Sequence, residues 1–250
     1  MNLAAATPGS VRTWLDAALA LLYPPACQLC GARRASAAEG YVCSRCWTQV
    51  RFIKPPFCER CGLPFDGALT TPFECSNCRD MELHFRSARS AVAAGAMILE
   101  VIHRYKYQRA LWFEPFLADI FLRQALQELK GEDWDFIVPV PLHPAKRRER
   151  EFNQAARLAR HLHRATGIPI NEELIFRAVP TRTQTQLSRE ARADNVRSAF
   201  VSRKHLRLNG ARIILVDDVF TTGATTNACA RLLRKAGSGE VCVWTVARGL

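Results

Sequence analysis

The sequence contains no long hydrophobic run. Among its 250 residues, no stretch approaches the roughly 18 consecutive apolar residues that a membrane-spanning helix requires. One apolar segment, residues 14–23, lies near the start, but Asp16 interrupts it, only Arg12 precedes it, and no small-residue cleavage site follows it. These absences argue against a membrane span and against a secretory signal peptide, so we expect a cytoplasmic protein.

Acidic residues are scarce relative to basic ones. Asp and Glu total 23 against 35 Lys and Arg, which gives a formal net charge of +12. Residues 1–90 contribute +3 of this excess and residues 91–250 contribute +9. Such a surface attracts polyanions, for example nucleotides or nucleic acid. An Arg-rich surface without a specific partner would give the same charge, so composition leaves both interpretations open.

Cysteine, by contrast, is abundant. The sequence has 10 cysteines, and eight of them form four Cys-x-x-Cys pairs. Two residues between cysteines let both thiolates of a tight turn point at one metal ion, and two such turns complete the tetrahedral shell of structural zinc. The pairs are 12 residues apart in the first unit and 13 in the second, which indicates two tandem zinc ribbons. The pairs are Cys27 and Cys30, Cys43 and Cys46, Cys58 and Cys61, and Cys75 and Cys78.

The spacing leaves the pairing open. In the sequential arrangement that we favour, the first two pairs hold one Zn2+ and the last two hold a second ion. In a crossed arrangement, the first and third pairs would share an ion. Reduced thiols or a redox motif are alternatives, but a redox motif belongs to a βαβ unit and would not occur four times. Four thiolates saturate zinc, so we expect structural sites. Cys229 and Cys242 stand apart and are expected to be buried small hydrophobic residues.

From residue 86 onward, the pattern alternates between strands and helices. We predict strands at 90–97, 135–140, 211–216 and 241–246, and helices at 98–107, 116–129, 153–166 and 225–236. Residues 177–200 are polar and without period, which is typical of a long mobile loop. Strands that alternate with helices predict an α/β fold, with a mostly parallel twisted sheet flanked by helices.

The segment most informative about chemistry is residues 213–226. An apolar strand is followed by Asp217 and Asp218, a turn rich in Thr with one Gly, and a helix. Ligands of parallel α/β sheets bind at the carboxyl ends of the strands, and amides at a helix N-terminus bind phosphate. Adjacent carboxylates beside such a turn suit ribose hydroxyls, with Mg2+ neutralising charge. A plain N-cap with threonines is the alternative. The turn residues are Thr221, Thr222, Gly223, Ala224 and Thr225.

In order and spacing, this segment resembles the motif that binds 5-phosphoribosyl-1-pyrophosphate (PRPP) in type I phosphoribosyltransferases. The resemblance implies a type I phosphoribosyltransferase-like fold, in which Asp217 and Asp218 contact the ribose 2′- and 3′-hydroxyls and residues 221–225 hold the 5′-phosphate. In hypoxanthine-type relatives, an acidic residue directly before the Thr-Gly pair serves as base. That position is Thr221 here, so the motif assigns no base and disfavours a purine 6-oxo substrate.

Two basic stretches add candidate phosphate ligands. Residues 138–143 lead into a run of Lys and Arg between 146 and 150, and a strand end followed by a basic loop suits a pyrophosphate. Residues 181–200 form a basic segment that can close over a polyphosphate. Solvated surface loops would have the same composition. The PRPP-binding residues inferred outside the turn are Lys106, His143, Arg147 and Arg192.

Taken together, these stretches resemble the ComF family over the whole chain. The resemblance rests on the paired zinc ribbons and on residues 105–107, 138–143, 152–154, 184–200 and 213–226. It implies a role in natural competence, where imported single-stranded DNA is handled on the cytosolic side of the membrane, or in the use of DNA as a nutrient. The family usually has Gly where this chain has Glu151 and Gln186, and Glu151 brings a negative charge near the proposed pyrophosphate loop.

The expected organisation has three parts. Residues 1–24 form an N-terminal amphipathic helix, because Leu15, Leu19 and Leu22 lie at helical spacing. Residues 25–84 form a double zinc ribbon, and residues 85–250 form a phosphoribosyltransferase-like domain.

Three classes of function remain open from the sequence. The first is a pentosyl-transfer enzyme that acts on PRPP with an unknown acceptor. The second is a non-catalytic module that senses PRPP or binds single-stranded DNA, which the mixed basic and aromatic residues of 103–113 favour. In the alternative interpretation of that segment, Tyr105 and Trp112 are core residues of an amphipathic helix. The third is a docking platform, in which the ribbons bind a competence helicase or uptake protein.

Overall fold

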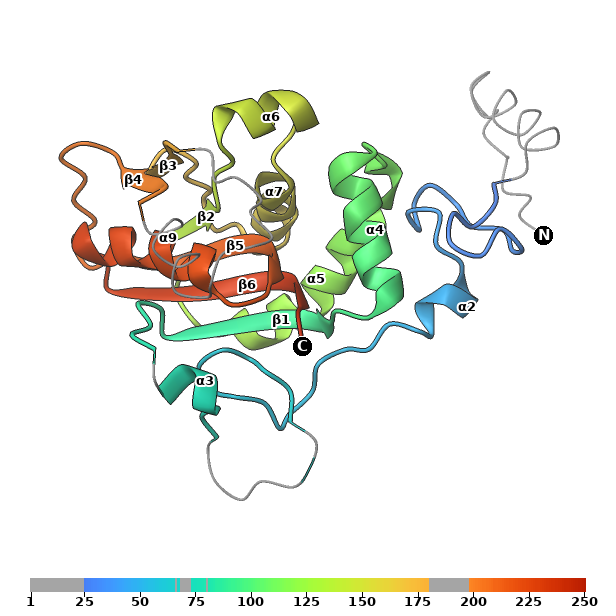
Figure 1. Cartoon of the computed structure of the whole chain (residues 1–250), viewed down its shortest axis with the longest axis horizontal. Coiled ribbons are helices and arrows are strands. Elements are labelled where there is room, and N and C mark those ends of the chain that lie inside the picture. Colours follow the sequence, from blue (N-terminus) through green and yellow to red (C-terminus); the bar gives the residue numbers. More distant parts are fainter. Residues whose placement is uncertain (1–24, 66, 68–72, 80, 180–197) are drawn as a thin grey trace, which may run out of the picture.

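The computed structural model describes residues 25–65, 67, 73–79, 81–179 and 198–250 (Figure 1). The predicted helix over 1–24, Gln186, Arg192 and most of the predicted 177–200 loop lie outside the described residues. Two short helices, α2 (Ser44–Trp47) and α3 (Ser76–Arg79), belong to the first and second ribbon respectively. Each helix carries one buried cysteine, which is Cys46 in α2 and Cys78 in α3.

Parallel strands form the central sheet in the order β1, β6, β5, β2. The two middle strands, β5 and β6, consist largely of buried residues on both faces, as expected for a parallel sheet covered on both sides. Their register places Asp217 of β5 opposite Thr245 of β6. The strand bounds are β1 (Ser87–Ala93), β2 (Phe136–Pro139), β5 (Arg212–Phe220) and β6 (Glu240–Arg248).

Different elements cover the two faces of the sheet. The helices α4, α5 and α7 pack on one face, and α9 packs on the other together with the second ribbon (Figure 1). Because successive strand residues alternate, Ile214 and Leu215 of β5 belong to the cores on opposite faces. By the same alternation, Asp218 lies on the α4 side and Asp217 on the α9 side. The helix bounds are α4 (Ala96–Tyr107), α5 (Glu114–Leu129), α7 (Gln154–Thr166) and α9 (Ala224–Lys235).

Other segments of the chain cover both edges of the sheet. At the β1 edge, the linker between the ribbons runs antiparallel to the strand, and Ile53 N donates to Ala91 O at 3.0 Å. At the β2 edge, Ile137 N donates to Pro169 O at 2.8 Å. Pairing of this kind removes the exposed strand edges that promote aggregation.

The structure confirms the α/β arrangement and corrects several boundaries. The first strand ends at Ala93, because Gly95 is the N-cap of α4 and Met97 is helical. The strand predicted to end at 216 continues to Phe220, so both acidic residues lie within β5. The basic residues after His143, predicted to form a loop, instead form the helix α6 (Pro144–Arg150), which a proline in the first turn and a side-chain cap both favour.

The ends of the predicted 177–200 loop form a small antiparallel pair, β3 (Ile175–Arg177) and β4 (Phe200–Ser202). Cys229 and Cys242 are buried as expected. In the described parts of the chain, no helix has both the length and the hydrophobicity needed to cross a membrane.

Candidate functional site

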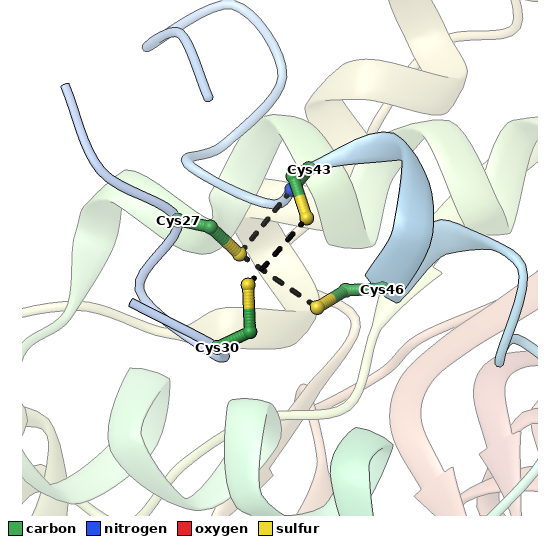
Figure 2. A group of neighbouring side chains, drawn as sticks. All are labelled: Cys27, Cys30, Cys43 and Cys46. Atoms are coloured by element: carbon green, nitrogen blue, oxygen red, sulfur yellow. Dashed lines mark hydrogen bonds between the residues drawn. The ribbon is translucent and has the colours of Figure 1, made fainter. Parts of the chain in front are cut away.

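Each ribbon brings its own four cysteine sulfurs together. The Sγ atoms within each group lie within 4.8 Å of one another. In the first group, the sulfurs of Cys27 and Cys46 are 3.8 Å apart, and those of Cys30 and Cys43 are 3.7 Å apart (Figure 2). A tetrahedral ion with Zn–S bonds of about 2.3 Å places its sulfurs about 3.8 Å apart. The two groups are Cys27, Cys30, Cys43 and Cys46, and Cys58, Cys61, Cys75 and Cys78.

The second group has the same geometry. Its sulfurs are 3.9 Å apart for Cys58 and Cys78, and 3.7 Å apart for Cys61 and Cys75. Both groups therefore fit the two zinc sites of a double zinc ribbon, and they combine consecutive pairs. The sequential pairing is confirmed, and the crossed pairing is not the one that the chain adopts.

Backbone amides favour the thiolate at the leading cysteine of each ribbon. Cys43 N donates to Cys27 Sγ, and Cys75 N donates to Cys58 Sγ, both at 3.3 Å. Burial opposes the negative charge of these sulfurs, but the amides outweigh it and lower the pKa of Cys27 to about 6. The pKa of Cys58 is lowered by the same balance of burial and amides. The thiolate is the form that binds zinc.

The two ribbons contact different parts of the body. The first packs against α4 and α5, where the ring of Trp47 meets that of Phe116 edge-on, with centroids 5.1 Å apart. The second packs against β1, and Arg89 of that strand donates to Glu59 O at 2.9 Å. Each ribbon is therefore held to the body by contacts of its own.

The carboxyl end of β5 holds a buried ion pair. Lys106 Nζ, from α4, lies 2.5 Å from Asp218 Oδ2. Asp218 is only 6% exposed, so its charge has little contact with water. Burial disfavours the charged form of Lys106, but Asp218 and then Asp217 outweigh that effect and raise the pKa of Lys106. The ammonium therefore stays charged and faces the acidic pair that the sequence identified.

The carboxyl group of Asp217 has a perturbed pKa. Its Oδ1 accepts the backbone N–H of Asp218 at 2.9 Å. Burial and the neighbouring charge of Asp218 raise the pKa of Asp217 to about 7, although Lys106 and that N–H act in the opposite direction. The two carboxylates thus interact, even though their residues begin on opposite faces of the sheet. Such a pair can accept hydrogen bonds from adjacent hydroxyls or bind a divalent cation.

Gly223 shapes the turn between β5 and α9. Its φ is 77°, and a Cβ added there would lie 2.5 Å from Phe220 Cζ, so a larger residue does not fit. The helix begins at Ala224 and carries no acidic side chain in its first turn. The first amides of a helix lack intrahelical acceptors and bear partial positive charge. The turn therefore provides the amide cradle that an anion requires.

The threonines of the turn divide by exposure. Thr221 and Thr222 are exposed and Thr225 is half-buried, so their hydroxyls are accessible beside the amides. Thr226 is buried and donates to Gly223 O at 3.0 Å, which gives it a structural role. The candidate phosphate residues of the turn are thus gathered at one helix end.

The basic stretch after β2 forms the helix α6, where the sequence predicted a loop. His143 caps α6, where its Nδ1 accepts the N–H of Ala145 at 3.2 Å. Arg147 is exposed on the outside of α6. Arg150 is the residue of this stretch that turns inward. It is 8% exposed, donates to Gln154 Oε1 at 3.2 Å, and its guanidinium lies 4.8 Å from the centre of the Tyr107 ring.

Arg177 of β3 is a further cation near the acidic pair. Burial lowers the pKa of Arg177, whereas the charge of Asp217 opposes that effect and the charge of Arg150 adds to it. Arg150 acts on Lys106 in the same way. Lys106, Arg150 and Arg177 therefore interact electrostatically with one another or with the acidic pair, and we call these three residues the cationic group. Arg150 belongs to the basic run visible in the sequence, but no local pattern marks Arg177.

Residues 151–153 join α6 to α7. Glu151 adopts a left-handed conformation with φ 68°, which explains why Gly suits this position. Its carboxylate lies 2.9 Å from Arg109, so its charge has a cationic partner. Asn153 caps α7 by accepting the N–H of Ala155 at 3.0 Å, and it donates to Val140 O at 3.1 Å. The segment therefore fixes the end of β2 against α7.

Three consecutive residues at the end of α4 have different surroundings. Tyr105 is buried and donates to Glu114 Oε2 at 3.3 Å. Lys106 reaches the acidic pair, and Tyr107 is 55% exposed. Trp112, in the short helix η1 (Leu111–Phe113), is 41% exposed. Of the two aromatic residues that one interpretation assigned to the core, only Tyr105 lies there.

Known proteins resemble the chain along most of its length. The family described as "Double zinc ribbon domain" matches residues 18–81. Competence protein F of Haemophilus influenzae is 33% identical over 220 residues, which cover 84% of this chain and 92% of that protein. DNA utilization protein YhgH of Escherichia coli K12 is 31% identical over 235 residues, 92% of this chain and 100% of that protein. Competence protein ComFC of Bacillus subtilis is 27% identical over 218 residues, 83% of this chain and 84% of that protein.

Similar solved structures include two phosphoribosyltransferases. Adenine phosphoribosyltransferase of Saccharomyces cerevisiae is 16% identical, with a TM-score of 0.36 over 58% of this chain and 72% of that one. Purine phosphoribosyltransferase of Pyrococcus horikoshii is 17% identical, with a TM-score of 0.33 over 53% of this chain and 82% of that one. These scores are too low to support an argument about the site. The sequence relatives are decisive, because their identity extends over nearly all of both chains: the chain belongs to the ComF family.

Proposed function

We propose that the end of β5 and the turn after it bind PRPP together with Mg2+. The observation that carries the proposal is the buried ion pair between Lys106 and Asp218, which lies directly before a glycine turn and a helix N-terminus. Burying charged groups costs free energy, and pairing them offsets only part of that cost. Such a buried pair is therefore a candidate for a functional role. A sugar-phosphate uses both halves of this arrangement, since its hydroxyls need acceptors and its phosphate needs donors.

The proposed ligand extends across the site from the turn to the cationic group. The ribose hydroxyls bind Asp217 and Asp218. The pyrophosphate faces the group of Lys106, Arg150 and Arg177, which adds two residues to the set inferred from the sequence. The 5′-phosphate binds the turn, and the residues proposed there and at the pyrophosphate are Thr221, Thr222, Gly223, Ala224, Thr225, His143, Arg147 and Arg192.

Mg2+ suits this site because carboxylate oxygens are the ligands that it prefers. When bound with the diphosphate it would neutralise charge on the leaving group. The chain itself contributes positioning and electrostatics: the acidic strand end orients the ribose, and the cations stabilise the departing pyrophosphate. With an acceptor present, this gives pentosyl transfer. No acidic residue directly precedes Thr222-Gly223, so this motif assigns no base for the acceptor.

The proposed biological setting is the handling of imported DNA in the cytoplasm. The relatives are named for competence or DNA utilization, and this chain resembles them from the ribbons through the acidic strand end. In this proposal, residues 1–24 are an amphipathic helix, 25–84 the double ribbon, and 85–250 the phosphoribosyltransferase-like domain.

Isothermal titration calorimetry with PRPP and MgCl2 tests the proposal. The wild type is expected to bind, and the double variant Asp217→Asn with Asp218→Asn is expected to lose binding. Asp119→Asn is the matched control, because Asp119 is an exposed carboxylate of α5 paired with Arg123. Equal affinity for PRPP in all three proteins would show that Asp217 and Asp218 do not contact the ligand. Release of pyrophosphate with a panel of bases then separates an enzyme from a sensor.

A second candidate function is binding of single-stranded DNA. The observation that favours it is the exposure of Tyr107 and Trp112 within the basic segment 103–113, because bases stack on exposed rings while cations follow the phosphates. Tyr107→Ala with Trp112→Ala should weaken binding of a fluorescent oligothymidine, and affinity should fall as salt rises. Affinity that is independent of salt would contradict this mode. In such a module, the ribbons would dock a competence helicase or uptake protein.

A further inference from the structure

Arg248, at the end of β6, connects the second zinc cluster to the turn after β5. Its side chain is buried, with the residue 6% exposed. On one side, Arg248 Nε donates to Cys61 O at 3.3 Å, and Nη2 lies 3.7 Å from Cys61 Sγ. On the other side, Nη1 donates to Thr221 O at 2.7 Å and to Phe220 O at 3.2 Å. One guanidinium thus contacts a zinc ligand and the backbone of the turn.

The same guanidinium holds the ring that shapes the turn. It lies 4.8 Å from the centre of the Phe220 ring. The edge of that ring occupies the space where a Cβ of residue 223 would be, so the position of Phe220 determines the path of the backbone at Gly223. Arg248 therefore acts on the turn at two points: its carbonyls and the side chain beneath it.

The second ribbon and this turn do not pack continuously. Away from Arg248, Asn227 of α9 donates to Glu82 O at 2.9 Å and accepts the N–H of His84 at 2.8 Å. A cavity of about 360 Å³ separates the ribbon from the turn, with Leu63 and Met81 on the ribbon side and Thr221 and Thr222 on the turn side. Across this cavity, the guanidinium of Arg248 contacts both Cys61 of the ribbon and Thr221 of the turn. Its charge also suits the position, because four thiolates around Zn2+ leave a net negative charge that an N–H donor stabilises.

We infer that Arg248 is a positioning residue through which the second zinc site supports the phosphate turn. The inference rests on the proposed function for its ligand, but it concerns the shape of the turn. It predicts two-way coupling: zinc in the second ribbon strengthens PRPP binding, and PRPP slows the loss of zinc from that ribbon, because linkage between two binding sites is reciprocal. The first ribbon lacks this connection in the described part of the chain, since its contacts are with α4 and α5.

Arg248→Lys and Arg89→Lys form a matched pair for the test. Both residues join the body to the second ribbon, but Arg89 contacts Glu59 and Glu128 rather than the turn. A lysine cannot reach Cys61 and Thr221 at once, since it lacks the planar fork. We expect PRPP affinity to fall by about tenfold in Arg248→Lys and to change little in Arg89→Lys. Zinc content and thermal unfolding report whether each variant folds.

Two measurements on the same proteins do not depend on affinity in the variants. Hydrogen exchange of the amides of 219–226, without ligand, should be faster in Arg248→Lys than in Arg89→Lys. In the wild type, PRPP should slow maleimide labelling of the second group of cysteines, resolved by mass spectrometry, and leave the first group unchanged.

If exchange at 219–226 is equal in both variants, the positioning role is wrong, whether or not PRPP binds. If the wild type binds PRPP and labelling of both groups is unaffected, the coupling is wrong while the proposed function stands. A wild type that binds no PRPP refutes the proposed function and the coupling, and leaves the exchange comparison to decide the role of Arg248.

Discussion

Lys106 and Asp218 come from different layers of the fold, one from a helix and one from the sheet, and their charged atoms are 2.5 Å apart. The positive charge of Lys106 offsets the repulsion between the two adjacent carboxylates at the end of β5. It also ties α4, on which the first ribbon packs, to the strand that precedes the phosphate turn.

Lys106→Met should therefore be costly. It leaves Asp218 buried without its cation, and removal of one partner from a buried pair costs about 3–5 kcal/mol of unfolding free energy. The double variant Lys106→Met with Asp218→Asn should recover most of that stability, because position 218 then carries no charge that needs a partner. Urea denaturation measures both proteins. A single variant as stable as the wild type would show that solvent reaches Asp218 and that the pair is not desolvated.

Asp217 should make stability depend on pH near neutrality. Its pKa is about 7 in the folded state and about 3.9 in an unfolded chain, so the folded state holds the extra proton between these values. Stability contributed by this group therefore falls as pH rises from 4 to 7, and the loss is complete above 7. Asp217→Asn does not ionise, so its melting temperature should exceed that of the wild type by an amount that grows from pH 5 to pH 8. A difference that is constant across this range would show that Asp217 does not titrate there.

Glu151→Gly should stabilise the protein. A non-glycine residue in the left-handed region costs roughly 1 kcal/mol, whereas the exposed pair with Arg109 contributes a few tenths. We expect a gain of about 0.5–1 kcal/mol, measured by denaturation. Glu149→Gly is the control, because it lies inside α6 and should lose about 1 kcal/mol. Destabilisation of both variants would mean that the ion pair outweighs the backbone strain.

The zinc pairing can be tested by metal content. The wild type should hold two zinc ions per chain, since two groups of four sulfurs are present. Cys27→Ser with Cys43→Ser removes two ligands from one group, so one ion should remain. Had the pairs been crossed, the same double variant would damage both sites. Loss of both ions, in a protein that circular dichroism shows to be folded, would contradict the sequential grouping.

The features that sequence reasoning predicted well are those written locally in the chain. Metal pairs two residues apart, and an apolar run followed by two acids and a glycine turn, each specify a geometry within a few residues. The boundaries that it missed have local causes of another kind. Gly95 is the N-cap of α4, so the helix begins at Ala96 and not at the predicted residue 98. Pro144 favours the start of α6, in a segment that was predicted to be a loop.

The residues that it missed depend on contacts between distant segments. Arg177 of β3 interacts electrostatically with Asp217, and Arg248 donates to Cys61 O, a residue far from it in the sequence. Neither position carries a pattern in its neighbours. Trp112 was expected to be buried because of its helical spacing, but it lies on a short helix at the surface. Periodicity describes one element, whereas burial depends on what covers it.

The place of β6 in the sheet has a consequence for biosynthesis. This strand is made after β1 and β5, yet it lies between them, so β1 has no strand partner in the sheet and β5 has only β2 until residues 240–248 have left the ribosome. The metal-binding segments, by contrast, need only nearby residues. A nascent chain would thus carry finished zinc modules ahead of an unassembled sheet, and the apolar strands waiting behind them would be the stage most exposed to aggregation.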